Sequence, residues 1–311
     1  MLYRSGRTTG LRIVQWLTSE GKTELLWEDP AFYQIPRLSP DGSRLAAALT
    51  AGSNSDIWVY DWRRGSRTRL TEPPGVNTHP RWSPDGQYVV FQSAGRLFWT
   101  RADGAERPQP LMKGQNLQFP DSFTPDGRRL AFTEQGRDGG SVIQTVAIES
   151  TSGGLRAGEP ELFHRTPSGN PYPAFSPDGR WLAYASSESG VYEIYVRAFP
   201  DRGRQWPIST DGGTLPVWSR GNELFYRTED NRLMVSTYTV VGDSFVAGKP
   251  RLWSDTRLFN MGLTQNFDLA PDGKRFAVLM SAEGPELRGT RHILVLNFFE
   301  EVRRRVAAGA R

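Results

Sequence analysis

Short apolar runs, separated by turn residues, recur along the whole chain. The runs at residues 88–91, 130–132, 181–184 and 275–279 each follow a Pro-Asp-Gly step, and another apolar run follows each of them, as at residues 193–196. Apolar runs of this length, bounded by turn residues, predict strands that are buried on both faces. Weaker, more polar runs such as residues 68–71 and 206–209 predict outer strands. The pattern is therefore all-β.

A seven-residue motif punctuates these strands. Its clearest form is Pro-Arg-Trp-Ser-Pro-Asp-Gly at residues 80–86, and related copies lie at residues 36–42, 122–127, 173–179, 216–221 and 267–273. Neighbouring copies are 41 to 52 residues apart, which is the length of a four-stranded propeller blade. Proline presets φ, aspartate caps the turn and glycine takes positive φ, so the motif predicts a hairpin turn.

The repeat predicts one β-propeller domain over residues 1–311, with six blades favoured and seven as the alternative. Residues 1–4, 11–17 and 23–27 read as second, third and fourth strands without an innermost strand. The last repeat, which ends in an expected third strand at 293–297, lacks a fourth strand. We expect the N-terminal strands within residues 1–28 to close the ring and remove two free edges. Residues 298–311 have helical composition and predict a short C-terminal helix or tail.

Composition narrows the chemistry. The chain has no cysteine, so disulfides, cysteine-ligated zinc and thiol catalysis are excluded. The net charge is +4, and its basic residues are mostly arginines scattered through turns and strand ends, which argues against nucleic acid as a partner. No apolar window is long enough for a membrane span, and Met1 opens without a leader. From these features we expect a soluble monomer without a signal peptide.

The repeat copies resemble the TolB-like or WD40-like (PD40) repeat of bacterial propellers, in which a Ser-Pro-Asp-Gly turn joins the first two strands of each blade. The resemblance covers nearly the whole chain. Residues 56–61, 193–200, 223–226 and 294–301 further resemble the C-terminal sensor propeller of bacterial transmembrane serine/threonine kinases. That resemblance implies a periplasmic or extracytoplasmic module that binds a ligand or partner. The kinase motifs themselves are absent, and one hypothesis is that the chain is part of a larger protein.

Polar residues precede or open each predicted innermost strand. We expect them to converge at one mouth of the channel, because the innermost strands all begin there. Ligands in propellers usually enter at this mouth. The turn aspartates lie at the opposite end and are predicted to be scaffold. The polar positions are Gln34, Asn77, His79, Gln118, Asp121, Asn170, Tyr172, Thr214, Asn266 and Asp268.

Two functions follow from this polar ring. The first is a non-catalytic module that binds a small molecule, peptide or protein at the loop-rich mouth. Its binding residues would be Gln34, Asn77, Gln118, Asn170, Tyr172, Thr214 and Asn266. A wet channel mouth would also be polar without binding anything.

The second function is a metal-dependent hydrolase of esters, lactones or phosphotriesters, because propeller hydrolases of the paraoxonase and gluconolactonase type look like this at their centre. Asp121, Asp268 and Asn266 would hold Ca²⁺, and His79, Asp121 and Asp268 would be the catalytic groups. No other cofactor is implied. The Gly-x-Ser-x-Gly, His-Glu-x-x-His and Walker motifs are all missing, which removes the standard serine-hydrolase, zinc-protease and nucleotide-binding signatures.

Overall fold

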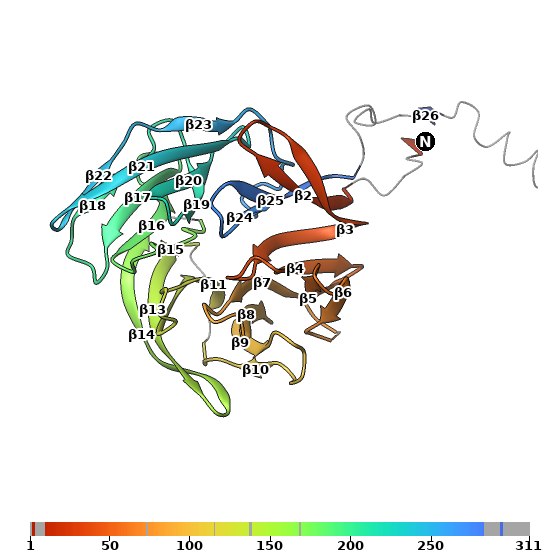
Figure 1. The fold of residues 1–311 in the computed structure, drawn as a ribbon. Coiled ribbons are helices and arrows are strands. Elements are labelled where there is room, and N and C mark those ends of the chain that lie inside the picture. The colour runs from red at the N-terminus through yellow and green to blue at the C-terminus, as the bar shows by residue number, and fades with distance from the viewer. Residues whose placement is uncertain are drawn as a thin grey trace, which may run out of the picture.

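The chain folds into a ring of antiparallel sheets (Figure 1). The computed structural model describes residues 2–3, 10–72, 74–114, 116–136, 139–167, 169–282 and 293–294. All regular structure in these residues is strand. No described segment forms a helix that could cross a membrane.

Four blades are separate sheets in which the strands run outward in chain order. Blade 2 consists of β7 (Asn77–Trp82), β8 (Tyr88–Ser93), β9 (Arg96–Arg101) and β10 (Gln109–Pro110). Blade 3 consists of β11 (Leu117–Phe123), β12 (Arg129–Gln135), β13 (Ser141–Thr151) and β14 (Gly154–Thr166). Blade 4 consists of β15 (Ala174–Phe175), β16 (Trp181–Ser186), β17 (Glu193–Ala198) and β18 (Gln205–Pro207). Blade 5 consists of β19 (Thr214–Trp218), β20 (Glu223–Arg227), β21 (Leu233–Val241), β22 (Ser244–Ala247) and β23 (Arg251–Ser254), the last two pairing with different halves of β21.

The remaining two blades share one long strand, β3 (Thr23–Leu38). Residues 23–31 of β3 pair with β2, and residues 32–38 pair with β4. Blade 1 therefore consists of the second half of β3 with β4 (Arg44–Ala51), β5 (Asn54–Asp61) and β6 (Ser66–Arg69). Blade 6 consists of β24 (Phe267–Leu269), β25 (Arg275–Ser281), β2 (Arg12–Thr18) and the first half of β3. The ring thus has six blades.

Blade 6 joins the two ends of the described chain. Its third and fourth strands come from residues 12–18 and 23–31, and β2 pairs with β25 over seven residues from Arg12 to Thr18. The expectation that residues 293–297 form the third strand is wrong, because β2 already occupies that position. Instead, β26 (Ile293–Leu294) pairs with β1 (Leu2–Tyr3). The predicted C-terminal helix at 298–311 lies outside the described residues.

The Ser-Pro-Asp-Gly turn is closed by its own polar side chains. In blade 1, the Ser39 hydroxyl donates to Asp41 Oδ1 at 2.6 Å, and Gly42 has a φ of 70°. Asp41 also accepts from the Ser43 hydroxyl at 2.6 Å, and these hydrogen bonds hold its pKa well below the usual range. The equivalent serine or threonine bonds its aspartate at Asp85, Asp126 and Asp178. Hydrogen bonding within the turns therefore accounts for these aspartates.

A second backbone feature recurs at the middle of the innermost strands. Ile35, His79, Tyr172 and Leu215 have φ between 47° and 58°, and each precedes a proline. Three of these positions coincide with a register shift against the second strand. A non-glycine residue at positive φ costs on the order of 1 kcal/mol. In blades 1, 2 and 5 the positive φ therefore accompanies a β-bulge, which re-aims the residues after it.

Neighbouring blades are tied together beside these bulges. Trp82 Nε1 donates to the backbone oxygen of Arg37 at 2.9 Å, and Trp218 Nε1 donates to that of Ala174 at 2.9 Å. Each tryptophan reaches the innermost strand of the preceding blade. Between the sheets lie apolar clusters such as the one in which Leu17 meets Phe225 and Phe276. The innermost strands are thereby fixed relative to one another around the centre.

Closure of blade 6 predicts that two leucines of the N-terminal strands contribute unequally to the free energy of unfolding. Leu17 on β2 is fully buried, whereas Leu25 on β3 is 43% exposed. Leu17→Ala should lower the free energy of unfolding by about 2–5 kcal/mol, because it leaves a cavity between blades. Leu25→Ala, the matched control, should cost well under half of that. Urea denaturation measures both, and equal losses would contradict the proposed closure.

Candidate functional site

A cavity of about 600 Å³ lies at the centre of the ring. Each blade contributes to its wall the residue that lies two positions before the first residue of the turn. These residues are Arg37, Arg81, Ser122, Ala174, Val217 and Asp268. In blades 1, 2, 3 and 5 a register shift ends at this residue, and such a shift decides which strand residues face the channel.

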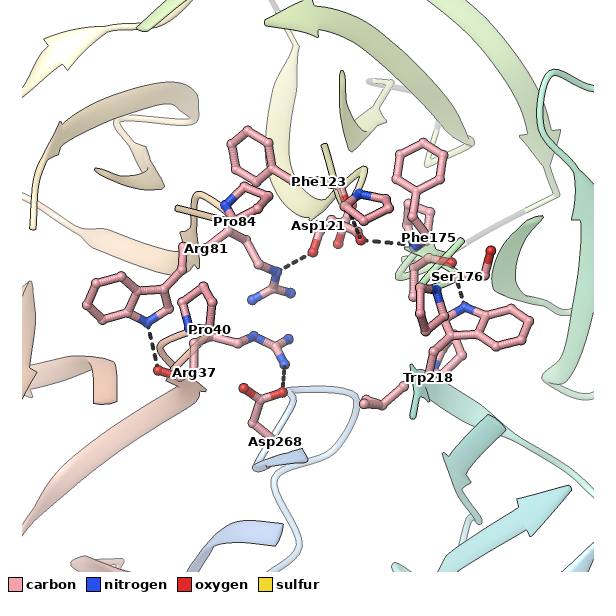
Figure 2. A pocket seen from close by; sticks show the side chains of 18 of the residues that line it. Arg37, Pro40, Arg81, Pro84, Asp121, Phe123, Phe175, Ser176, Trp218 and Asp268 are labelled. Carbon is pink, nitrogen blue, oxygen red and sulfur yellow. Dashed lines mark hydrogen bonds and ion pairs between the residues drawn. The ribbon is translucent and has the colours of Figure 1, made fainter. Parts of the chain in front are cut away.

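The cavity reaches the end of the ring that carries the turns. Pro40, Pro84, Pro125 and Pro177 of the turns line it, together with Arg220 of blade 5. Aromatic side chains of the innermost strands stand beside these prolines, as Figure 2 shows for Phe123, Phe175 and Trp218. The sequence had pointed to the opposite mouth. The main cavity instead combines an apolar rim at the turn end with a polar interior.

Four charged side chains form an arc on one side of the interior, in the order Asp268, Arg37, Arg81 and Asp121 from blades 6, 1, 2 and 3 (Figure 2). Arg37 Nη1 lies 3.2 Å from Asp268 Oδ1, and Asp268 Oδ2 accepts from the Leu38 backbone at 2.8 Å. The facing wall carries only Ala174 and Val217 at the equivalent positions. The interior is thus polar on one side and apolar on the other.

Arg81 is held by backbone oxygens rather than by a carboxylate. Its Nε donates to the backbone oxygen of Asp121 at 2.5 Å, and its Nη1 donates to that of Pro80 at 3.0 Å. The Asp121 side chain accepts from the Thr133 hydroxyl at 2.7 Å through Oδ2. Its Oδ1 is buried without a partner in the described part of the chain. Both side chains thus keep unused hydrogen-bonding capacity next to the cavity.

Burial shifts the ionisation of this arc. It raises the pKa of Asp121 to about 7 and also raises that of Asp268, where contact with Arg37 limits the rise. Burial and the neighbouring Arg37 lower the pKa of Arg81 to about 9. At neutral pH both arginines stay protonated while Asp121 is partly neutral. The interior therefore carries a net positive charge.

Of the ten polar residues predicted to form a ring, Asp121, Tyr172 and Asp268 line the cavity. Six of the others make hydrogen bonds that hold the innermost strands in place. Their partners are Thr50 for Gln34, Asp56 for Asn77, Glu134 for Gln118, Tyr172 and Thr133 for Asn170, Arg227 for Thr214, and Arg227 and Phe259 for Asn266.

His79 lies beside the arc but not in the cavity wall. Its ring contacts Phe119 edge-on, with the centroids 4.9 Å apart. Burial, together with the charges of Arg81 and Arg37, lowers its pKa to about 3. The imidazole is therefore neutral at physiological pH, and its Nδ1 has no partner among the described residues.

The predicted calcium ligands are not arranged around one point. Asp121 and Asp268 lie at the two ends of the arc, and two arginines stand between them (Figure 2). The Asn266 amide oxygen accepts from Arg227 at 3.3 Å. No group of three or more histidine, aspartate or glutamate side chains in the described residues could hold a metal ion. Like-charge repulsion from the arginines disfavours a cation here and favours an anion.

A ring of blades around a central cavity defines the class: this protein is a β-propeller. Residues 10–97 match the family model described as "TolB beta propeller domain". The solved structure of a putative TolB from Agrobacterium tumefaciens has a TM-score of 0.64 at 19% identity, covering 88% of this chain and 99% of that one. TolB from Acinetobacter baumannii gives 0.53 at 18% identity, covering 88% and 64%. Residues 10–97 thus match the TolB propeller model, and the ring as a whole resembles the TolB structures in fold.

A longer relative shares part of the sequence. The uncharacterized peptidase YuxL of Bacillus subtilis is 26% identical over 212 residues, which cover 52% of this chain and 31% of that protein. The chain therefore matches less than a third of that relative's length. The word peptidase describes the longer protein.

The sequence interpretation missed Arg37 and Arg81, although both stand inside the repeat motif as Pro-Arg-Leu-Ser and Pro-Arg-Trp-Ser. The available signal was a charged residue within an otherwise apolar innermost strand. Charged side chains are rarely buried without a partner or a role, so that position could have been singled out.

The raised pKa of Asp121 predicts a specific pH dependence. A carboxyl with a pKa of about 7 when folded and 3.8 when unfolded binds more proton in the folded state between these values. Its contribution to stability therefore falls as pH rises through this window. Asp121→Asn removes that loss, so the mutant should gain on wild type by about 1 kcal/mol per pH unit from pH 5 to 7.

Urea denaturation across this range measures the gain. Asp126→Asn is the matched control, because hydrogen bonding to Thr124 lowers the pKa of that turn carboxyl and it stays ionised throughout. Its difference from wild type should not change with pH. A constant difference for Asp121→Asn as well would show that the carboxyl titrates normally.

Proposed function

We propose that this TolB-like propeller is a binding module whose central cavity receives a small molecule or a peptide segment at the turn end. The observation that carries the proposal is the pair of guanidinium groups of Arg37 and Arg81, which point into the middle of the cavity (Figure 2). Neither Nη2 atom has a hydrogen-bond partner among the described residues. Donors aimed into an enclosed space are typical of ligand sites.

The size and walls of the cavity support the same function. Its volume of about 600 Å³ falls within the range of about 300–1,000 Å³ that small-molecule sites occupy. Proline and aromatic side chains line the rim, including Trp82 and Trp218, and supply apolar area for a ligand or a peptide side chain. A few polar groups on one wall would fix the orientation of whatever enters.

Binding fits the interior better than metal-dependent hydrolysis does. The two carboxyls that would carry a cation flank two arginines, and neutral His79 lies outside the cavity wall. The peptidase name belongs to a relative of which this chain covers 31%. No feature of the cavity favours hydrolysis.

Filling the apolar wall tests the proposal. Ala174 faces the cavity, whereas Ala105 is exposed in the loop after β9. Saturation-transfer NMR with a panel of sugars, amino acids, carboxylic acids and short peptides should find compounds that bind the wild type. Ala174→Trp should weaken that binding at least tenfold because the indole occupies the space, and the matched Ala105→Trp should leave it unchanged. Absence of binding to the wild type, or equal binding to both variants, would contradict the proposal.

A further inference from the structure

The turn of blade 5 departs from the repeat at the cavity rim. Five turns carry proline, at Pro40, Pro84, Pro125, Pro177 and Pro271, whereas blade 5 carries Arg220. Replacing a turn proline usually costs about 0.4–1 kcal/mol through the unfolded state. Departures from a local rule that have no structural gain are expected at functional sites. The departure here places a cation at the cavity rim.

Arg220 is free to act on a ligand. Its side chain is exposed, it lines the cavity, and it makes no ion pair with any described residue. The turn of blade 5 also lacks the aspartate of the motif, so no turn carboxylate stands beside Arg220 in the sequence. Blade 5 faces blade 2, which carries Arg81, across the six-membered ring (Figure 1). Positive charge therefore stands on opposite sides of one cavity.

Arg81 carries a buried charge deeper in the cavity. It is 7% exposed, yet within the described residues its only polar partners are two backbone oxygens. Arg37 of blade 1 is paired with Asp268. The Asp121 carboxyl attracts Arg81 without forming an ion pair with it among the described residues, and burial raises the pKa of this carboxyl to about 7, so the charge of Arg81 is only partly compensated. Burying an incompletely paired charge is costly, and an anionic group of a ligand would offset it.

Other polar groups of the wall are already committed. The Ser122 hydroxyl accepts from the Phe175 backbone at 3.0 Å, Tyr172 donates to the Leu263 oxygen at 2.5 Å, and Gln265 donates to the Phe267 oxygen at 3.1 Å. Unused donors among the described residues include Arg37 Nε and the Nη2 groups of Arg37 and Arg81, with Arg220 at the rim. These donors match oxyanions, which planar guanidinium groups bind through paired hydrogen bonds.

We propose that the cavity binds an organic acid with two carboxylate groups, one held by Arg81 and Arg37 at depth and the other by Arg220 at the rim. This inference rests on the proposed binding function. Three arginines and two aspartates line the cavity, and its net charge lies between +1 and +2 because Asp121 is partly neutral. That charge matches a ligand with two single negative charges better than a polyphosphate, which would carry more.

Isothermal titration of the full chain with acetate and with linear dicarboxylates from malonate to suberate tests the inference. The best diacid should bind at least tenfold more tightly than acetate and than its own monomethyl ester, which corresponds to about 1.4 kcal/mol. Arg81→Gln should weaken diacid and monoester alike by tenfold or more. Arg220→Gln should bring the diacid to the level of the monoester and leave the monoester unchanged.

Arg156→Gln is the matched control, because Arg156 is exposed on β14 and outside the cavity wall. It should bind every probe as the wild type does. Thermal denaturation checks that each variant folds. If Arg81→Gln unfolds, Arg81→Lys is used instead. Lysine keeps the positive charge but cannot make the paired hydrogen bonds of a guanidinium group. Lysine should still weaken both probes.

Equal affinity for mono- and dicarboxylates, unchanged diacid binding in Arg220→Gln, or equal binding of inorganic phosphate would overturn the inference. These results are distinct from failure of the proposed function. If uncharged panel compounds bind wild type and are lost in Ala174→Trp while no carboxylate preference exists, the cavity binds ligands but the dicarboxylate assignment is wrong. If nothing binds, both proposals fail.

Discussion

The innermost strands are constrained by the turns that end them and, in several blades, by a bulge in the backbone, and the central cavity depends on both. At one end the Ser-Pro-Asp-Gly turn is closed by hydrogen bonds such as that from Ser39 to Asp41. At the middle a residue such as Ile35 or His79 adopts positive φ before a proline and shifts the register. In blade 1 three residues lie between these points, Pro36, Arg37 and Leu38, and the middle one points into the cavity.

This constraint turns a repeated scaffold into a variable site. The positions that face the channel are equivalent in all six blades, yet their identities are Arg37, Arg81, Ser122, Ala174, Val217 and Asp268. Because the turns and the bulges already define the backbone, these side chains are free to differ without altering the blade. The binding that we propose would therefore depend on a position that varies between otherwise repeated strands.

The charges at the variable positions are only partly compensated within the chain. Arg37 has a carboxylate partner in Asp268, whereas Arg81 has only backbone oxygens. Burial also raises the pKa of Asp121 to about 7, which removes part of the negative charge that could have compensated Arg81. The apolar wall at Ala174 and Val217 offers no compensation. The cavity is thus complementary to an anion that the chain does not supply.

The sequence predicted the parts of the structure that local chemistry controls. Proline, aspartate and glycine specify the turns directly, so the repeats, their length, the all-β fold and the scaffold role of Asp41 and its equivalents were predictable. The residues that line the cavity were not predictable, because a register shift of one residue exchanges the faces of a strand. Arg37 and Arg81 therefore read as parts of the motif, whereas Asn77 and Gln118 read as channel residues. Only the folded register separates the two sets.

Our central proposal is that the Arg37 and Arg81 guanidinium groups bind a carboxylate inside the central cavity. A crystal structure of the chain grown with a saturating dicarboxylate tests this most directly. The account predicts planar density between the two guanidinium groups, with oxygens about 2.7–2.9 Å from their Nη atoms. An unoccupied interior at saturating dicarboxylate, or carboxylate bound only on the outer surface of the ring, would contradict it.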